Sequence, residues 1–337
     1  MIRILTRSRA NPEKGVSTYK EVFAVAGFFL LFTPIIAIYR ITDFMIFCIF
    51  AMSFDLLYGY MGRLSFGHVL YLGTGVYVAT LFSIYVNSNP LLSMFAGILG
   101  GAIIGAILGL IVVKLGGASF ALVNLAFNQV GYFLVSSTFQ QITHGTDGIS
   151  CGVESWGFLN FANQYVSYFF ILISLLLVFY ILRKLTASPF GVLIRSIKEN
   201  EIRVKFLGYN IFLHKWITFV VASAFASFAG TLYALYDQYV SPTFIHPLNN
   251  VEPIFAVLIG GAGNLYGAIA GGLVYMVMKD WLSAHITIWE WILGLLLLVV
   301  VFWFRHGLVG FVNTTIQLIK AKKANTIYHR LESDIND

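Results

Sequence analysis

The chain has 337 residues, of which 58% are apolar and only 11% are charged, and its formal net charge is +6. A soluble domain carries about 25% charged residues, and a soluble globule of this length cannot hide so much apolar surface. The composition therefore excludes a soluble enzyme, a disordered chain and a nucleic-acid-binding domain.

Long stretches without Asp, Glu, Lys or Arg indicate the class of protein. These stretches are 22–39, 64–113, 115–146, 155–182, 216–236 and 253–278. A helix that crosses a bilayer needs about 20 apolar residues. The stretches are continuously apolar rather than alternating, which excludes a membrane β-barrel. We predict an all-α, polytopic integral membrane protein.

In chain order, the predicted spans are 22–39, 42–62, 66–86, 91–113, 119–139, 162–182 and 213–236, followed by a Gly-rich stretch, 251–283, and a last span, 288–304. Gly260, Gly261 and Gly263 predict a break in the Gly-rich stretch, which we expect to cross twice or to re-enter. The pattern therefore predicts about ten transmembrane or re-entrant helices, and eight to ten are compatible with it.

Basic residues predict the orientation. Residues 1–20, 183–215 and 305–337 together hold 17 of the 21 Lys and Arg residues. Cytoplasmic loops carry an excess of Lys and Arg, so we expect all three segments, and both termini, on the cytoplasmic side. The expected domains are a basic N-terminus (1–21), a transmembrane domain (22–304) with a cytoplasmic loop (183–212), and a basic C-terminal tail (305–337).

Charged side chains in the spans need an explanation, because each costs about 2.5–3.5 kcal/mol at a helix centre. Asp55 either faces a pathway or an ion, or is a partner for Arg63 or for a helix N-terminus. Lys114 and Lys279 end apolar runs, so we expect them to reach the lipid headgroups.

Amides and small residues also recur within the spans. Asn124 and Asn128 are four residues apart and share a helix face, and Gln129 follows them. These amides either line a polar pore or form bonds between helices. Glycines every four residues, which let two helices approach closely within the chain or between chains, are Gly97, Gly101, Gly105 and Gly109.

Catalytic and cofactor signatures are not visible in the sequence. The run GGAG at 260–263 has no Lys after it, unlike a phosphate-binding loop. His residues are scattered without metal-ligand spacing, and Cys48 and Cys151 lie in different environments. We expect no enzymatic activity, no cofactor, no metal and no disulfide.

The loop 183–215 predicts short helices outside the bilayer. Ser188 can cap a helix that Pro189 begins, and Gly208 can close the segment. We expect a turn near Asn200 between two helical stretches. An apolar stripe at helical spacing consists of Phe190, Leu193, Ile194 and Ile197. The stripe fits either a helix on the lipid surface or a docking surface, and the acidic pair Glu199 and Glu201 favours docking.

Several motifs together resemble the permease subunits of branched-chain amino acid ABC transporters. The motifs occur in the family's order over about residues 40–310, and they are SFGHVLYLGTGVYVAT (65–80), LAFNQ (125–129), ITHGTDGI (142–149), IKENEIRVKFLGYN (197–210), SFAGTLYA (227–234), SPTF (241–244), VLIGGAGNLYGAIAGG (257–272) and FRHGLVG (304–310).

This resemblance implies one permease subunit of a bacterial inner-membrane importer. Its partners would be a second homologous permease, two ATP-binding cassette subunits that hydrolyse ATP, a periplasmic solute-binding protein and membrane lipid, with no nucleic acid. The loops 140–160 and 237–250 would face the binding protein. The coupling residues would be Arg195, Lys198, Glu199, Asn200, Glu201 and Gly208. The pathway or gating residues would be Ser65, Gly67, His68, Asn124, Asn128, Gln129, Gly260, Gly261 and Gly263.

The sequence also departs from the family pattern. Gln129 and Tyr132 stand where the family usually has an acidic residue and an Arg. The resemblance implies a branched-chain or other hydrophobic amino acid as the solute, and this departure leaves urea and short amides as an alternative. An ion-coupled secondary transporter that uses Asp55 or Asp237, and a channel, remain the alternative classes.

Overall fold

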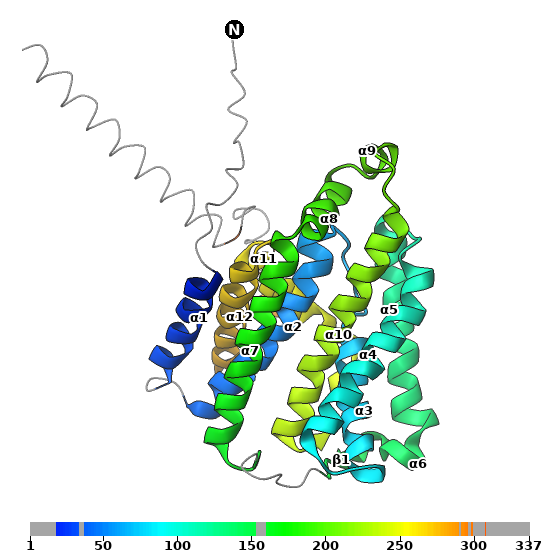
Figure 1. Ribbon diagram of the computed structural model, residues 1–337. Helices are drawn as coiled ribbons and strands as arrows, with labels where there is room; N and C mark the ends of the chain where they lie inside the picture. Colours follow the sequence, from blue (N-terminus) through cyan, green and yellow to red (C-terminus); the bar gives the residue numbers. More distant parts are fainter. Residues whose placement is uncertain are drawn as a thin grey trace, which may run out of the picture.

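The computed structural model describes residues 18–33, 37–152, 160–289, 291–295, 298 and 307. These residues form a helical bundle with one two-stranded ribbon (Figure 1), which confirms the predicted all-α class. The α-helices are α1 (Thr18–Phe32), α2 (Ile38–Asp55), α3 (Val69–Tyr85), α4 (Pro90–Val112), α5 (Gly117–Phe133), α6 (Gln140–Thr143), α7 (Gln164–Ala187), α8 (Pro189–Glu199), α9 (Glu201–Phe206), α10 (Ile211–Asp237), α11 (Val251–Gly260) and α12 (Leu265–His285).

Shorter elements connect the helices. Two π-helical turns extend helices: η1 (Leu56–Tyr60) follows α2 and η2 (Leu134–Thr138) follows α5. The 3-10 turns are η3 (Gly145–Asp147), η4 (Pro242–Ile245) and η5 (Pro247–Asn250). Strands β1 (Ile149–Ser150) and β2 (Tyr239–Val240) pair antiparallel, with Ile149 opposite Val240.

The observed helices follow the predicted spans closely. Five described helices are long and apolar enough to cross a bilayer, and a sixth span results if the bent pair formed by 247–260 and 265–285 counts as one. This pair bends by 117° at its break, where the glycines predicted it. The helices α1 and α3 are shorter, with 15 and 17 residues, and most of the predicted last span, 288–304, lies outside the described residues.

Helix α2 forms the centre of the bundle, and α4 and α5 form its periphery. Within the described residues, 89% of the apolar window of α2 is buried, compared with 28% for α4 and 22% for α5. The glycine stripe of α4 packs inside this chain: a Cβ at Gly97 would overlap Thr231, and one at Gly101 would overlap Ser227. Ser227 also donates a hydrogen bond to the Gly97 carbonyl (2.8 Å).

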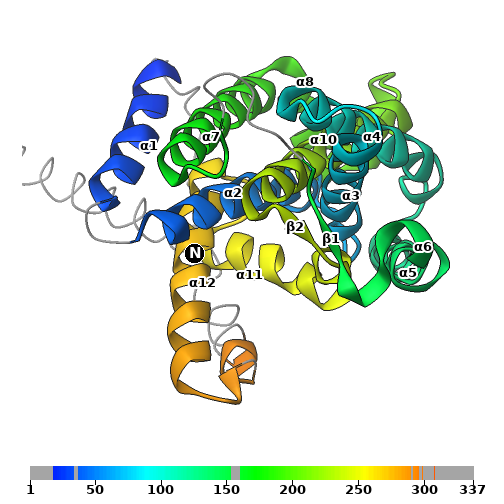
Figure 2. The ribbon, with the colours of Figure 1, turned by 90° about the horizontal axis from the view of Figure 1, so that it is seen from below.

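The bundle has two distinct ends. One end carries α8 and α9, at the top of Figure 1, and the ribbon lies at the opposite end, which Figure 2 shows from below. We call them the α8–α9 end and the ribbon end.

Helix α11 has 10 residues and is about 15 Å long, half of the roughly 30 Å hydrocarbon core. It therefore begins inside the bundle, where Asn250 accepts a hydrogen bond from the Val69 amide at the start of α3 (2.9 Å).

Candidate functional site

The helices α8 and α9 form as the loop pattern predicts. Ser188 caps α8 by accepting a hydrogen bond from the Gly191 amide (3.4 Å), and Asn200 caps α9 by accepting one from the Arg203 amide (2.9 Å). Gly208 follows α9 with φ +86°, a conformation that glycine adopts freely. The turn at Asn200 therefore divides the segment into two short helices.

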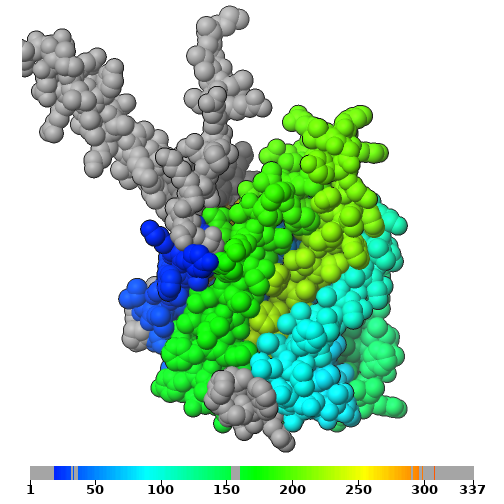
Figure 3. All heavy atoms as spheres, in the orientation of Figure 1, coloured from blue at the N-terminus to red at the C-terminus, as the bar shows by residue number. Residues whose placement is uncertain are grey.

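The apolar stripe of α8 packs on its own bundle. Ile194 and Ile197 are each 1% exposed, so this face is not available to lipid. The most exposed apolar side chains of the segment lie on α9 and just after it: Ile202, Phe206 and Leu207 are 69%, 87% and 69% exposed. Helix α9 projects beyond the bundle at the top of Figures 1 and 3, where a partner could contact it.

The two glutamates of this segment have different surroundings. The Glu201 carboxylate forms salt bridges with the Arg63 guanidinium and the Lys215 ammonium, each with an N···O distance of 2.5 Å. Burial alone would raise the pKa of Glu201, but the bonds from Lys215 and Arg63 outweigh it and hold this pKa below its ordinary value. Glu199 is exposed at the end of α8. Of these two glutamates, Glu199 is the one whose carboxylate is exposed and forms no salt bridge within the described residues.

Lys198 links α8 to the end of α2. Its ammonium donates a hydrogen bond to the Gly59 carbonyl in η1 (2.6 Å), and the Gly263 amide donates one to the Asp55 carboxylate (2.8 Å). A Cβ at Gly59 would overlap both the Asp55 carboxylate and the Gly263 backbone. Asp55 thus contacts the backbone of the Gly-rich break, while Arg63 pairs with Glu201.

The Gly-rich break is a tight turn that requires glycine. Gly261 and Gly263 have φ values of +106° and +82°, which L side chains rarely adopt. Asn264 then begins α12 by accepting a hydrogen bond from the Tyr266 amide (3.1 Å). Gly260 still belongs to α11 and touches the Gly267 carbonyl so closely that a Cβ would overlap it.

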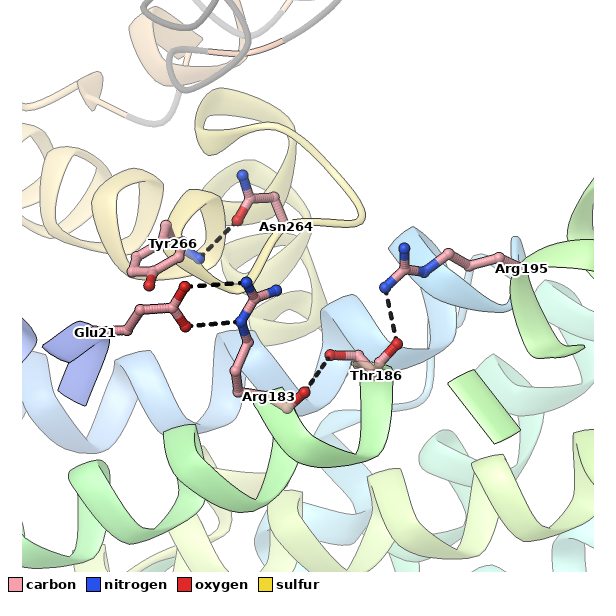
Figure 4. A network of polar contacts seen from close by, with 6 residues as sticks. All are labelled: Glu21, Arg183, Thr186, Arg195, Asn264 and Tyr266. Carbon is pink, nitrogen blue, oxygen red and sulfur yellow. Dashed lines mark hydrogen bonds and ion pairs between the residues drawn. The ribbon is translucent and has the colours of Figure 1, made fainter. Parts of the chain in front are cut away.

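Arg195 joins α8 to the end of α7, and a second arginine joins α7 to α1 (Figure 4). Arg195 donates a hydrogen bond to the Thr186 carbonyl (2.9 Å) and lies 5.0 Å from the centre of the Tyr60 ring. Arg183 donates two hydrogen bonds to the Glu21 carboxylate (2.8 and 3.1 Å). The predicted coupling residues thus lie where several helices of the bundle end.

His68 is buried among the aromatic rings of Phe50, Phe54 and Tyr71. Its Nε2 is 2.9 Å from the Ser53 hydroxyl, and its ring stacks on Phe50 at 5.3 Å. Ser65 is buried and accepts a hydrogen bond from the Gly67 amide (3.3 Å). A Cβ at Gly67 would overlap the Asn124 backbone, so the first predicted pathway motif packs directly against α5.

The amides of α5 separate into two groups. Asn128 donates to the Ile245 carbonyl (2.9 Å) and accepts a bond from Asn250 (2.5 Å), so it bonds between segments of the chain. Asn124 is buried and donates to the Phe120 carbonyl of its own helix (2.9 Å). Gln129 is exposed, unlike the two buried asparagines.

A cavity of about 270 Å³ lies near the ribbon end, between the helices α2, α3, α10, α11 and α12. Figure 2 shows α2, α10, α11 and α12 beside one another in this region. The lining residues are Asp43, Phe47, Phe50, Val69, Leu72, Tyr233, Asp237, Phe244, Asn249, Glu252, Met276 and Lys279. Phe50 forms the floor of the cavity, and its ring stacks on the buried ring of His68.

Charged groups gather on one wall of the cavity. Lys279 forms a salt bridge with Glu252 (2.5 Å), so it does not extend to the headgroups as the sequence predicts. Tyr233 donates a hydrogen bond to Asp43, and Asp237 is exposed at the mouth. The sequence does not single out Asp43 or Glu252, because both lie at the start of a helix, where charge is ordinary.

Apolar helices of spanning length and a broken helix pair, with two short helices at one end, define a multi-pass helical membrane protein. The sequence model of a family described as "branched-chain amino acid transport system / permease component" matches residues 36–302. The chain belongs to this family and is a permease component, a transport subunit.

Individual relatives support this assignment. The chain is 26% identical over 321 residues to the high-affinity branched-chain amino acid transport system permease protein LivM of Salmonella typhimurium, covering 88% of this chain and 75% of the relative. It is 23% identical over 261 residues to LivH of the same organism (72% and 83%). It is 24% identical over 221 residues to the nucleoside ABC transporter permease NupC of Lactococcus lactis (59% and 65%). No solved structure matches the chain at a significant level.

Proposed function

We propose that the chain is one of two homologous permease subunits of an ABC importer in the bacterial inner membrane. It forms half of the path for a branched-chain or other hydrophobic amino acid, and two separate ATP-binding cassette subunits hydrolyse ATP. The names of the relatives LivM and LivH support the solute and the paired permeases. The observation that carries the proposal is the α8–α9 segment, whose apolar face packs on the bundle while its tip projects outward.

The charge pattern supports a cytoplasmic position for the α8–α9 end, because residues 183–215 carry seven Lys and Arg. Both termini then lie in the cytoplasm, and the ribbon end faces the periplasm. The ribbon joins the two loops expected to meet the solute-binding protein, since Ile149 pairs with Val240. In this orientation the cavity lies on the side from which the solute arrives.

The contacts of Lys198 suggest how ATP hydrolysis reaches the path. A displacement of α8 by the ATPase pulls on the Gly59 carbonyl through Lys198. Gly59 lies against Asp55 and Gly263, so the motion reaches the end of α11. The other end of α11 carries Glu252 in the cavity. A rigid helix of about 15 Å thus connects the coupling segment to the solute path.

The exposed carboxylate of Glu199 provides the test. We expect Glu199→Lys to leave insertion and assembly intact and to reduce solute-stimulated ATP hydrolysis about tenfold or more, because it reverses charge on the docking face. ATP hydrolysis is measured on the importer assembled in nanodiscs with its solute-binding protein. The control is Asp280→Lys, the same charge change on α12, outside the α8–α9 segment, the cavity lining and the loops 140–160 and 237–250.

Three outcomes would contradict the proposal. Normal hydrolysis and uptake with Glu199→Lys, while the ATPase still co-purifies, would remove the coupling role of the segment. Solute uptake by this chain alone in proteoliposomes, without ATPase subunits, would place it among secondary transporters. Binding of the α9 tip to lipid vesicles rather than to the ATPase would assign Phe206 and Leu207 to the membrane surface.

A further inference from the structure

The cavity at the ribbon end has an acidic wall without a matching cation. Its lining includes three carboxylates, Asp43, Asp237 and Glu252, and one ammonium, Lys279. Lys279 is already paired with Glu252 at 2.5 Å. Within the described residues, neither Asp43 nor Asp237 forms a salt bridge. The lining therefore carries more carboxylates than cations, with Asp43 half-buried and Asp237 exposed at the mouth.

The rest of the lining is mostly apolar. Apart from the polar Tyr233 and Asn249, it consists of Phe47, Phe50, Val69, Leu72, Phe244 and Met276. Cavities that bind small molecules combine an apolar lining with a few polar groups that orient the ligand. A half-buried carboxylate is stabilised when a cation with hydrogen-bond donors pairs with it. The cavity thus complements a molecule with an ammonium group at one end and an apolar body at the other.

We propose that Asp43 and Asp237 bind the ammonium group of the transported amino acid, whose apolar side chain occupies the floor of the cavity. This assignment rests on the proposed function and deepens it by identifying the residues that select the solute. Lys279 lies beside this position and binds the solute carboxylate in exchange with Glu252. A neutral solute such as urea or a nucleoside leaves Asp43 and Asp237 unpaired and is rejected.

A competition experiment tests the chemistry of the ligand. The assembled importer in nanodiscs, without the solute-binding protein, is incubated with tritiated leucine, and bound label is measured by scintillation proximity. Leucine and isoamylamine, which carry an ammonium group on an apolar chain, should displace the label. Isocaproate, which lacks the ammonium, and urea should not displace it. Displacement by sodium ions but not by isoamylamine would make this a site for an inorganic cation and overturn the proposal.

Variants test the residues. Asp43→Asn and, at the exposed mouth, Asp237→Asn should each weaken leucine binding about tenfold to a hundredfold, the value of a charge-assisted hydrogen bond. Asp237→Asn keeps the test valid if Asp43→Asn fails to assemble. Asp147→Asn, at the same end but outside the cavity, should leave binding unchanged. Unchanged binding in both cavity variants would overturn the assignment.

The two proposals fail separately. The wild-type importer could show ATP-driven uptake while both cavity variants bind leucine normally. This result would contradict only the cavity assignment. Normal leucine binding by the wild-type complex, without any ATP-driven uptake, removes the importer function and leaves the cavity as an amino-acid site. Binding is measured in nanodiscs and uptake in proteoliposomes, both made from the same purified complex.

Discussion

At the residue scale, Glu201 holds three segments together through one carboxylate. Arg63 follows η1, Lys215 belongs to α10, and Glu201 begins α9. The side chain of Glu201 is 41% exposed, so water screens the pairs and their net value is about 1 kcal/mol or less. Their role is therefore to fix the position of α9, and a charge reversal at Glu201 would disturb this position as well as any docking.

This ion-pair cluster predicts a pH dependence. The pKa of Glu201 is lowered in the folded protein, so the stabilisation is complete above the ordinary pKa of about 4.5 and is lost as the pH falls through the lower folded value. We expect Glu201→Gln to lower the melting temperature of the detergent-purified protein at pH 7, and the difference from wild type to shrink below pH 4.5. A difference that stays constant down to pH 3 would contradict the ionic origin.

At the element scale, the break between α11 and α12 determines where the coupling segment meets the bundle. The 117° bend turns the chain back at Gly261 and Gly263, whose φ values are positive. The Gly263 amide then reaches Asp55. The described Gly307 also packs against Gly261 so closely that a Cβ would overlap it. The turn thus depends both on backbone conformation and on close approach.

Substitution of Gly261 tests this turn. Gly261→Ala and Gly261→Val should both reduce uptake at matched membrane abundance, with the larger loss for Val, because strained backbone of this kind costs about 1–3 kcal/mol. The control is Gly27→Ala in α1, where an added Cβ meets nothing within 4 Å. Full uptake by both Gly261 variants would mean that the turn tolerates a side chain and plays no strained role.

At the scale of the whole molecule, the two ends serve different partners in our proposal. The α8–α9 end carries exposed apolar and charged side chains, while the ribbon end holds the paired loops and the cavity. The connection between them runs through α2 and α11, which lie side by side. This arrangement places docking and solute binding at opposite ends of the same two helices.

Cysteine labelling tests the orientation. The labelled positions are exposed and lie within the described residues. In a variant without Cys48 and Cys151, a cysteine at Thr146 should react with a membrane-impermeant maleimide in intact cells whose outer membrane is permeable to it. A cysteine at Arg203 should react only after lysis. Labelling of Arg203→Cys from outside would invert the topology.

Local patterns in the sequence determined the helices and their ends. Uninterrupted apolar runs can be satisfied in lipid only by helices, because each backbone group must find a partner within its own segment. Caps such as Ser188 and Asn200 act within three residues, so the division of the coupling segment into α8 and α9 was predictable. The glycines of the break were recognisable for the same reason, since a positive φ is a local requirement.

Tertiary structure decided which polar residues meet, because their partners are distant in sequence. Glu199 and Glu201 look alike in the chain, but only Glu201 meets Arg63, 138 residues away. In the sequence, Lys279 resembles a residue that anchors a helix at the lipid headgroups. In the fold, α11 places Glu252 beside it and the two side chains form a salt bridge. The cavity arises where the ends of α2, α10 and α12 converge, and no periodicity within one helix encodes that convergence. The sequence by itself thus determined the class of protein and its helices, while packing among the helices created the charged wall and the link to the coupling segment.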